Sequence, residues 1–157
     1  MRKLFILVTL VSVIISGQAI ADDQSIVVTP SGSTASIKGI PANFTGTVNI
    51  DLLLPSSLKT PSSSGLVTFS PGARTAWHSH PAGQMLIVTA GKGWVEREGE
   101  GGQILSPGDV VWIPAGVKHW HGATDITAMS HIAVTYVHDG KNVDWFEPVT
   151  DKKYLTD

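Results

Sequence analysis

The most informative segment for the fold is residues 74–91, RTAWHSHPAGQMLIVTAG. It contains two histidines two positions apart, His78 and His80, and then an apolar run that begins at Gln84. Successive side chains of a β-strand point to opposite faces, so His78 and His80 project from the same face. The turn Pro81-Ala82-Gly83 reverses the chain and brings Gln84 close to His80. The stretch therefore predicts two adjacent strands with polar groups between them.

A second pair of histidines, His119 and His121, has the same spacing and therefore also shares one face of a strand. Three imidazoles and the amide oxygen of Gln84, held on adjacent strands, form a site for a borderline divalent metal with open positions for water or substrate. A closed structural zinc site is one alternative, but such sites usually use cysteine, and the chain has none. The other alternative is buried histidines that only satisfy their hydrogen bonds in the core.

Short β-prone runs separated by turn signals continue along the chain. Ser106-Pro107-Gly108-Asp109 has Pro and Gly at its central positions, as a type II turn requires, and Asp139-Gly140 closes the last hairpin region. This spacing predicts an all-β sandwich or barrel, with a surface loop over 55–64 and a helical turn near 151–155. The expected strands are 25–29, 34–38, 45–52, 66–70, 75–80, 84–90, 93–97, 102–105, 110–113, 119–123 and 128–137.

Composition limits the function classes. The 157 residues suit one domain, and the net charge is −2 with basic residues scattered along the chain. This argues against a nucleic-acid surface, which needs a basic patch. The absence of cysteine excludes a disulfide framework and a thiolate metal site.

Residues 1–21 have the pattern of a signal peptide: a basic start, an apolar run and a small-residue cleavage site ending at Ala21. We expect a mature single domain over 22–157, with its metal-binding barrel core at about 44–138, that is periplasmic or secreted and has no membrane anchor after cleavage. An uncleaved anchor or a buried helix is the alternative.

Several strands are apolar on both faces, which predicts a homodimer or higher homo-oligomer. The alternative is a monomer whose outer apolar residues lie under the N-terminal strands or the C-terminal tail. Trp77 and Trp120 alternate with the histidines, and we expect packing or interface roles for them.

Two stretches resemble the motifs of the cupin family. They read Gly72-(five)-His78-Ser79-His80-(three)-Gln84-(six)-Gly91 and Gly108-(five)-Pro114-Ala115-Gly116-(two)-His119. The resemblance implies a single cupin double-stranded β-helix, a jelly-roll barrel, with His78, His80, Gln84 and His119 as metal ligands. Gln84 stands where the family usually has Glu, and Ala123 replaces a common Asn. The amide removes a negative charge from around the metal, which becomes a stronger Lewis acid.

A narrower resemblance runs from Phe44 to Tyr154. Its main stretches, 43–48, 71–78, 83–94, 107–112, 118–123 and 143–145, look like the bacterial cupin hydroxynitrile lyases. Those enzymes are manganese-dependent and cleave or form (R)-mandelonitrile. The resemblance implies a cyanohydrin lyase with Mn(II), or else Fe(II), Zn(II), Co(II) or Ni(II), and a small-molecule substrate. The chain departs from one such lyase at Thr135, where that enzyme has Gln, and in its export signal.

The resemblance also places His121 and His131 in the cavity. Cyanohydrin cleavage needs a base for the hydroxyl proton, and histidine, with an ordinary pKa of about 6.5, suits that role. His121 could instead be a fifth ligand, and His131 a buried hydrogen-bonding residue. Two other functions stay open: a metal-dependent cupin oxygenase and a non-catalytic periplasmic metal or small-ligand binder.

We expect structural roles for the remaining polar candidates. His138 is predicted at the surface, Lys118 and Asp109 as surface and turn charges, and Arg74 as the partner of a carboxylate that the sequence does not identify. The inward side chains expected beside the metal are Val67, Thr75, Leu86, Val88, Met129 and Thr135.

Overall fold

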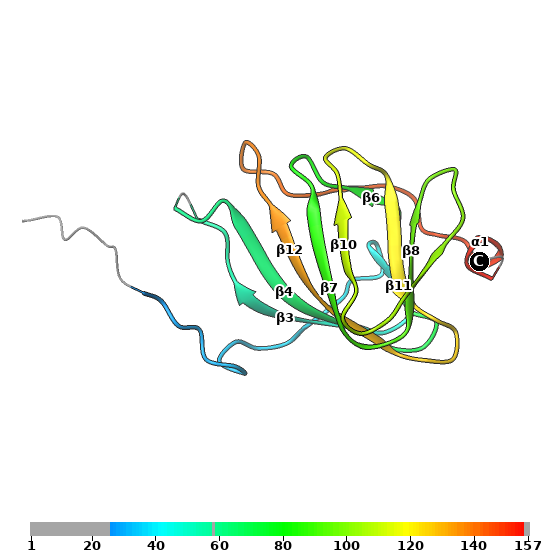
Figure 1. Ribbon diagram of the computed structural model, residues 1–157, viewed down its shortest axis with the longest axis horizontal. Helices are drawn as coiled ribbons and strands as arrows, with labels where there is room; N and C mark the ends of the chain where they lie inside the picture. The colour runs from blue at the N-terminus through cyan, green and yellow to red at the C-terminus, as the bar shows by residue number, and fades with distance from the viewer. Residues whose placement is uncertain (1–25, 58, 156–157) are drawn as a thin grey trace, which may run out of the picture.

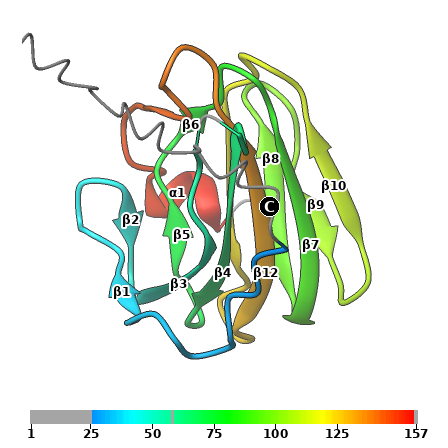
Figure 2. The same cartoon turned by 90° about the vertical axis from the view of Figure 1, so that its left-hand side faces the viewer.

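Two antiparallel sheets face each other and enclose the interior of a barrel (Figure 1). The structure is a computed structural model that describes residues 26–57 and 59–155. Figure 2 shows β2, β5 and β6 on one side and β12, β7 and β10 on the other. The all-β fold predicted from the turn spacing is confirmed, and of the two architectures left open the structure has the barrel. Its elements are β1 (Ile37–Lys38), β2 (Phe44–Thr45), β3 (Val48–Leu54), β4 (Ser62–Phe69), β5 (Arg74–Thr75), β6 (His78–Ser79), β7 (Gln84–Gly91), β8 (Gly93–Arg97), β9 (Gln103–Leu105), β10 (Val110–Ile113), β11 (His119–Ala123), β12 (Met129–Tyr136), β13 (Asp144–Trp145) and α1 (Asp151–Tyr154).

The first sheet has the order β1-β3-β4-β12-β7-β10 and the second the order β13-β6-β11-β5-β2. β8 pairs with β11, and β9 pairs with β8, so this hairpin extends the second sheet. Three strands, β8, β10 and β11, have the bounds predicted from the sequence. The turn before β10 is also as predicted, because Gly108 has a φ of 95° and the Asp109 N–H donates to the Ser106 carbonyl at 3.0 Å.

The N-terminal predictions were partly wrong. Ser25 lies outside the described residues, as does the predicted signal peptide, and Ile26–Thr29 form no strand. No sheet edge pairs with this segment, and the side chains of Ile26, Val27 and Val28 are 94%, 74% and 78% exposed. Of the expected strand 34–38, only Ile37–Lys38 pair, with β3. The expected strand 45–52 is divided into β2 and β3 by a turn at Gly46, whose φ is 77°.

Two further element boundaries differ from the sequence prediction because they depend on tertiary contacts. The predicted loop 55–64 ends early, because Ser62–Ser64 pair with Tyr136, Thr135 and Val134 of β12. The predicted strand 75–80 is interrupted at Ala76 and Trp77. There the N–H groups donate to the carbonyls of Asn43 and Glu147, outside the regular ladder.

The main core fills the space between the sheets. Its buried residues are Val48, Phe69, Ala73, Leu86, Val88, Val95, Leu105, Ile113, Ala123 and Met129. Each large aliphatic or aromatic side chain buried here stabilises the fold by about 1.5–3 kcal/mol. Gly93 has no room for a side chain, because a Cβ would lie 2.2 Å from the Gly122 carbonyl oxygen.

A second cluster lies on the outer face of the second sheet, under the C-terminal tail. Trp77 and Trp120 pack there against Val149 and Tyr154. The Trp120 indole N–H donates to the buried Glu96 carboxylate at 3.1 Å, and Lys153 lies 2.7 Å from the same carboxylate oxygen. The tail therefore covers the two tryptophans, in agreement with the expected packing role.

Arg74 fastens the tail to the barrel. Its guanidinium donates to the Val149 carbonyl from Nη2 at 2.9 Å and to the Asp151 carboxylate at 2.5 Å. It also lies 4.5 Å above the centre of the Tyr154 ring. Asp151 is thus the carboxylate partner that the sequence left open. Among residues 26–57 and 59–155, no helix is long and apolar enough to cross a bilayer.

Candidate metal centre

Five histidines and one glutamine converge inside the barrel. β6 contributes His78, β11 contributes His119 and His121, and β12 contributes His131. His80 follows β6 directly, and Gln84 begins β7 after the turn at Gly83, where φ is 82°. All six side chains are buried. His138, predicted at the surface, is exposed.

Strand register brings the two histidine pairs together. His119 of β11 lies directly opposite His78 of β6, and the two ring centres are 4.1 Å apart. One nitrogen from each of His78, His80 and His119 falls within 4.8 Å of the others, which is the geometry of a three-histidine metal site.

Backbone carbonyls fix the orientation of these three rings. The Nδ1 atoms of His78, His80 and His119 lie 3.0, 2.6 and 2.9 Å from the carbonyl oxygens of Ala76, Asn142 and Val117. A carbonyl only accepts, so each Nδ1 carries the hydrogen and each Nε2 keeps its lone pair. The Nε2 atoms of His80 and His119 are buried without a hydrogen-bond partner. A cation held between the rings would satisfy them.

Burial keeps the three rings neutral. It lowers the pKa of His119 to about 4, and burial with the charges of His119 and His80 lowers the pKa of His78 well below its ordinary value. Burial also lowers the pKa of His80, although the Asn142 carbonyl and the Gln84 side chain oppose this shift. Neutral imidazole is the form that binds a metal.

Gln84 presents an oxygen to the same site. Its amide nitrogen donates to the Thr135 hydroxyl at 3.0 Å, and its Oε1 is buried without a partner. Among the described residues, the groups that could hold a metal here are the three imidazoles and this neutral amide oxygen, which together suit a borderline divalent transition metal.

His121 and His131 form a second pair beside the triad. The His131 Nε2 lies 3.3 Å from the His121 Nδ1, and both rings contact Phe69. The outer nitrogens, His121 Nε2 and His131 Nδ1, have no partner in the described structure. Burial lowers the pKa of His131 to about 4, and burial with the neighbouring histidines lowers the pKa of His121 well below 6.5.

A bulge in β7 lies opposite His131 of β12. The pairing with β7 shifts between Ser130 and His131, so that Thr89 is skipped. Bulges of this kind redirect side chains near functional sites. No residue pattern in β7 identifies the bulge, which depends on the pairing of β7 with β12.

His78, His80, His121, His131 and Gln84 line an apolar cavity of about 210 Å³, whereas His119 lies behind this lining. Of the six side chains expected there, Val67, Thr75 and Thr135 line it, whereas Leu86, Val88 and Met129 point inward but belong to the core. Sequence reasoning missed Trp145, whose ring centre is 4.8 Å from that of His78 because β13 pairs with β6. It also missed the Asn142 carbonyl, which no side-chain pattern can indicate. The other lining residues missed are Phe44, Ile50, Leu52, Ser63, Ser64, Gly65, Phe69, Ala133 and Val143.

Sequence comparison with known proteins identifies the family of this chain. Residues 65–135 match the model of the cupin domain. An (R)-mandelonitrile lyase from Granulicella tundricola is 56% identical over 123 residues, which cover 78% of this chain and 94% of that protein. The chain belongs to the cupin family. Its six convergent side chains all lie within the matched range.

Solved cupin structures extend the comparison. The crystal structure of a cupin-like protein from Thermotoga maritima superposes with a TM-score of 0.73 at 41% identity, covering 76% of this chain and 90% of that one. A predicted oxalate decarboxylase from Thermotoga maritima has a TM-score of 0.63 at 20% identity, covering 72% of this chain and all of that one (100%). The second likeness concerns the fold alone.

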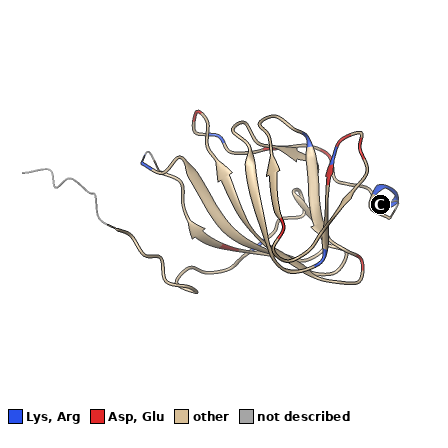
Figure 3. Cartoon of the chain, viewed as in Figure 1, with Lys and Arg blue, Asp and Glu red and all other residues tan. Residues whose placement is uncertain are grey.

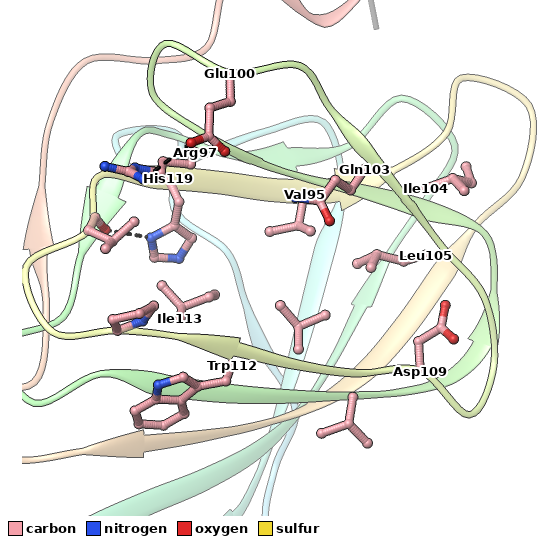
Figure 4. Close-up of a pocket in the computed structure, with 14 residues that line it drawn as sticks. Val95, Arg97, Glu100, Gln103, Ile104, Leu105, Asp109, Trp112, Ile113 and His119 are labelled. Atoms are coloured by element: carbon pink, nitrogen blue, oxygen red, sulfur yellow. Dashed lines mark hydrogen bonds and ion pairs between the residues drawn. The ribbon is translucent and has the colours of Figure 1, made fainter.

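A larger cavity of this cupin, about 540 Å³, lies between the β8–β9 hairpin and β10 (Figure 4). Of the five buried histidines only His119 reaches it, and its other polar residues include the ion pair Arg97–Glu100 at 3.2 Å. Despite its size, it lacks the converging donors, so the smaller cavity is the candidate site.

The buried neutral histidines predict acid sensitivity of the metal-free protein. The His131 pKa is 6.5 in the unfolded chain and about 4 in the fold. The unfolded state therefore binds more protons between these values, and the free energy of unfolding falls as pH falls through this range. His131 alone contributes a loss of about 2 kcal/mol between pH 7 and pH 5. Urea unfolding at both pH values checks this, with His131→Gln as the variant that should lose less; an equal loss in both proteins contradicts it.

Proposed function

We propose that this cupin is a metal-dependent lyase that cleaves or forms small cyanohydrins. The observation that carries the proposal is the cavity in which unpaired nitrogens of two histidine groups converge beside an amide oxygen. The 56% identity to an (R)-mandelonitrile lyase over most of the chain supports the enzyme class.

In this proposal His78, His80, Gln84 and His119 hold one divalent metal, with Mn(II) as the first expectation. Fe(II), Zn(II), Co(II) and Ni(II) suit similar nitrogen and oxygen donors. When bound, the metal supplies a positive charge that lowers the pKa of a nearby hydroxyl. Because Gln84 is neutral, the protein ligands cancel none of this charge.

The proposed base is His121, assisted by His131. When the His121 Nδ1 hydrogen is donated to the His131 Nε2, the unpaired His121 Nε2 carries a lone pair that can accept the substrate hydroxyl proton. The electron pair of the O–H bond forms the carbonyl, the bond to the nitrile carbon breaks, and cyanide leaves with that bond's electrons. The protonated His121 then returns the proton to give hydrogen cyanide. His131 stabilises the transient imidazolium by accepting its Nδ1 hydrogen.

Apolar walls suit the organic part of such a substrate. The second sheet contributes Phe44 of β2 and Trp145 of β13 to the apolar lining. The first sheet contributes Val67 and Phe69 of β4 and Ala133 of β12. A cavity of about 210 Å³ has room for one small molecule beside these apolar side chains.

The lyase proposal predicts cyanide release from racemic mandelonitrile by the manganese-loaded protein, with a preference for one enantiomer. His119→Ala removes a metal-binding imidazole and should reduce release to the uncatalysed rate. Colorimetric cyanide detection with chiral chromatography of the remaining substrate makes the measurement. Release that is equal in His119→Ala, or absent in the metal-loaded wild type, contradicts the proposal, and oxygen uptake by the iron-loaded protein then tests the oxygenase alternative.

The same assay tests the base. His121→Ala and His131→Ala should each lower turnover, His121 by about a hundredfold or more because it accepts the proton. Manganese affinity should change little in His131→Ala, which separates proton transfer from metal binding. Unchanged turnover in both variants contradicts the assignment.

We also propose that the cupin forms a homodimer through the outer face of the first sheet. Cross-strand neighbours there are apolar: Val110 lies beside Ile87, and Ile87 beside Ile132. Trp112 and Tyr136 extend this face, and Figure 3 shows charged residues mainly in loops and at strand ends.

Light scattering at micromolar concentration should give a dimer. Val110→Lys places a charge in the proposed interface and should give a monomer. Ile126→Lys changes another exposed apolar side chain, away from this face, and should leave the dimer intact. A monomeric wild type contradicts the interface.

Finally, we propose that residues 1–21 direct export and are removed, leaving a periplasmic or secreted protein. The basic start, apolar run and Ala-Ile-Ala ending support this. Intact mass of the protein recovered from outside the cytoplasm should correspond to a chain that begins at Asp22. A mass that retains Met1 in every fraction contradicts it.

A further inference from the structure

The orientation of the Gln84 amide depends on a residue of the neighbouring strand. Gln84 of β7 pairs directly with Thr135 of β12, and both side chains face the interior at 5% and 8% exposure. The amide Nε2 donates to the Thr135 hydroxyl oxygen at 3.0 Å. No other hydrogen bond of this amide is present among the described residues, and its Oε1 is unpaired.

The two ends of an amide differ chemically. The oxygen is an acceptor and can bind a cation, whereas the NH2 group only donates. When the oxygen faces the metal position, the NH2 group faces the wall and needs an acceptor there, because a buried donor without one is costly. Thr135 provides that acceptor.

We propose that Thr135 is a positioning residue of the metal centre, whose hydroxyl holds the Gln84 oxygen toward His78, His80 and His119. The inference rests on the metal site of the proposed function and is independent of the lyase reaction. A carboxylate at position 84 has two equivalent oxygens and needs no such partner, so the hydroxyl at 135 compensates for the amide at 84.

Thr135→Val keeps the shape of the side chain and removes the hydroxyl. With metal bound, the amide NH2 is then buried without an acceptor. Without metal, the amide can turn over and donate to the free imidazole nitrogens, so the cost falls on the bound state. We expect Mn(II) affinity to weaken about tenfold or more in Thr135→Val, and to stay within about twofold of wild type in Thr135→Ser. Competition with a fluorescent chelator measures the dissociation constants.

The Gln84→Glu background provides the decisive control. There the side chain cannot present a wrong end, so adding Thr135→Val should weaken Mn(II) binding several-fold less than it does beside Gln84. An equal loss in both backgrounds, or wild-type affinity in Thr135→Val, overturns the inference, as does a wild type that binds no Mn(II). Thr135→Ala gives the same comparison if the valine variant does not fold. A protein that behaves as expected here but releases no cyanide overturns the lyase proposal alone.

Discussion

The hydrogen bond from each triad imidazole to a backbone carbonyl is the constraint on which the site depends. The three carbonyls belong to Ala76, Val117 and Asn142, and each lies just outside a regular strand. A carbonyl inside a ladder is already engaged, so the interruptions before β6, β11 and β13 leave acceptors free for the histidines. The irregular joints of the barrel are therefore what fix the tautomers and aim the lone pairs.

This arrangement also explains how so many titratable rings share one apolar interior. Charged imidazoles at ring-centre distances of 4.1–5.8 Å would repel strongly, and burial already disfavours the charged form. All five are therefore neutral near pH 7, which leaves unpaired lone pairs in a cavity. Such groups are costly unless something binds them. In the proposed function, a divalent cation satisfies His78, His80 and His119, and a substrate hydroxyl satisfies His121 and His131.

The two faces of β11 connect the site to the outside of the barrel. His119 and His121 point inward, and Trp120 between them points outward to Glu96, Val149 and Tyr154. The tail that Arg74 fastens thus packs against the strand that carries two of the site histidines. Its packing contacts support β11 beside β6, and their stabilisation offsets part of the cost of burying polar rings on the opposite face of β11.

Local pattern alone determined much of this protein. The i, i+2 spacing of His78 and His80, and of His119 and His121, fixed their common faces, because a strand has a period of two. Turn residues such as Pro107-Gly108 impose their own backbone angles, so the bounds of several strands could be predicted to the exact residue. The cupin motifs supplied the barrel and the order in which its strands bring the donors together.

Only the tertiary structure decided which groups meet. Strand partners distant in sequence determine the register of His119 against His78 and the bulge in β7 opposite His131. They also determine the approach of Trp145 and of the Asn142 carbonyl. The unpaired Ile26–Val28 segment failed as a strand for the same reason: a strand needs a free partner edge as well as β-prone residues. The orientation of the Gln84 amide likewise depends on Thr135, which lies 51 residues further along the chain. Sequence specifies the donors through local geometry, and the fold specifies their partners through contacts that no local pattern contains.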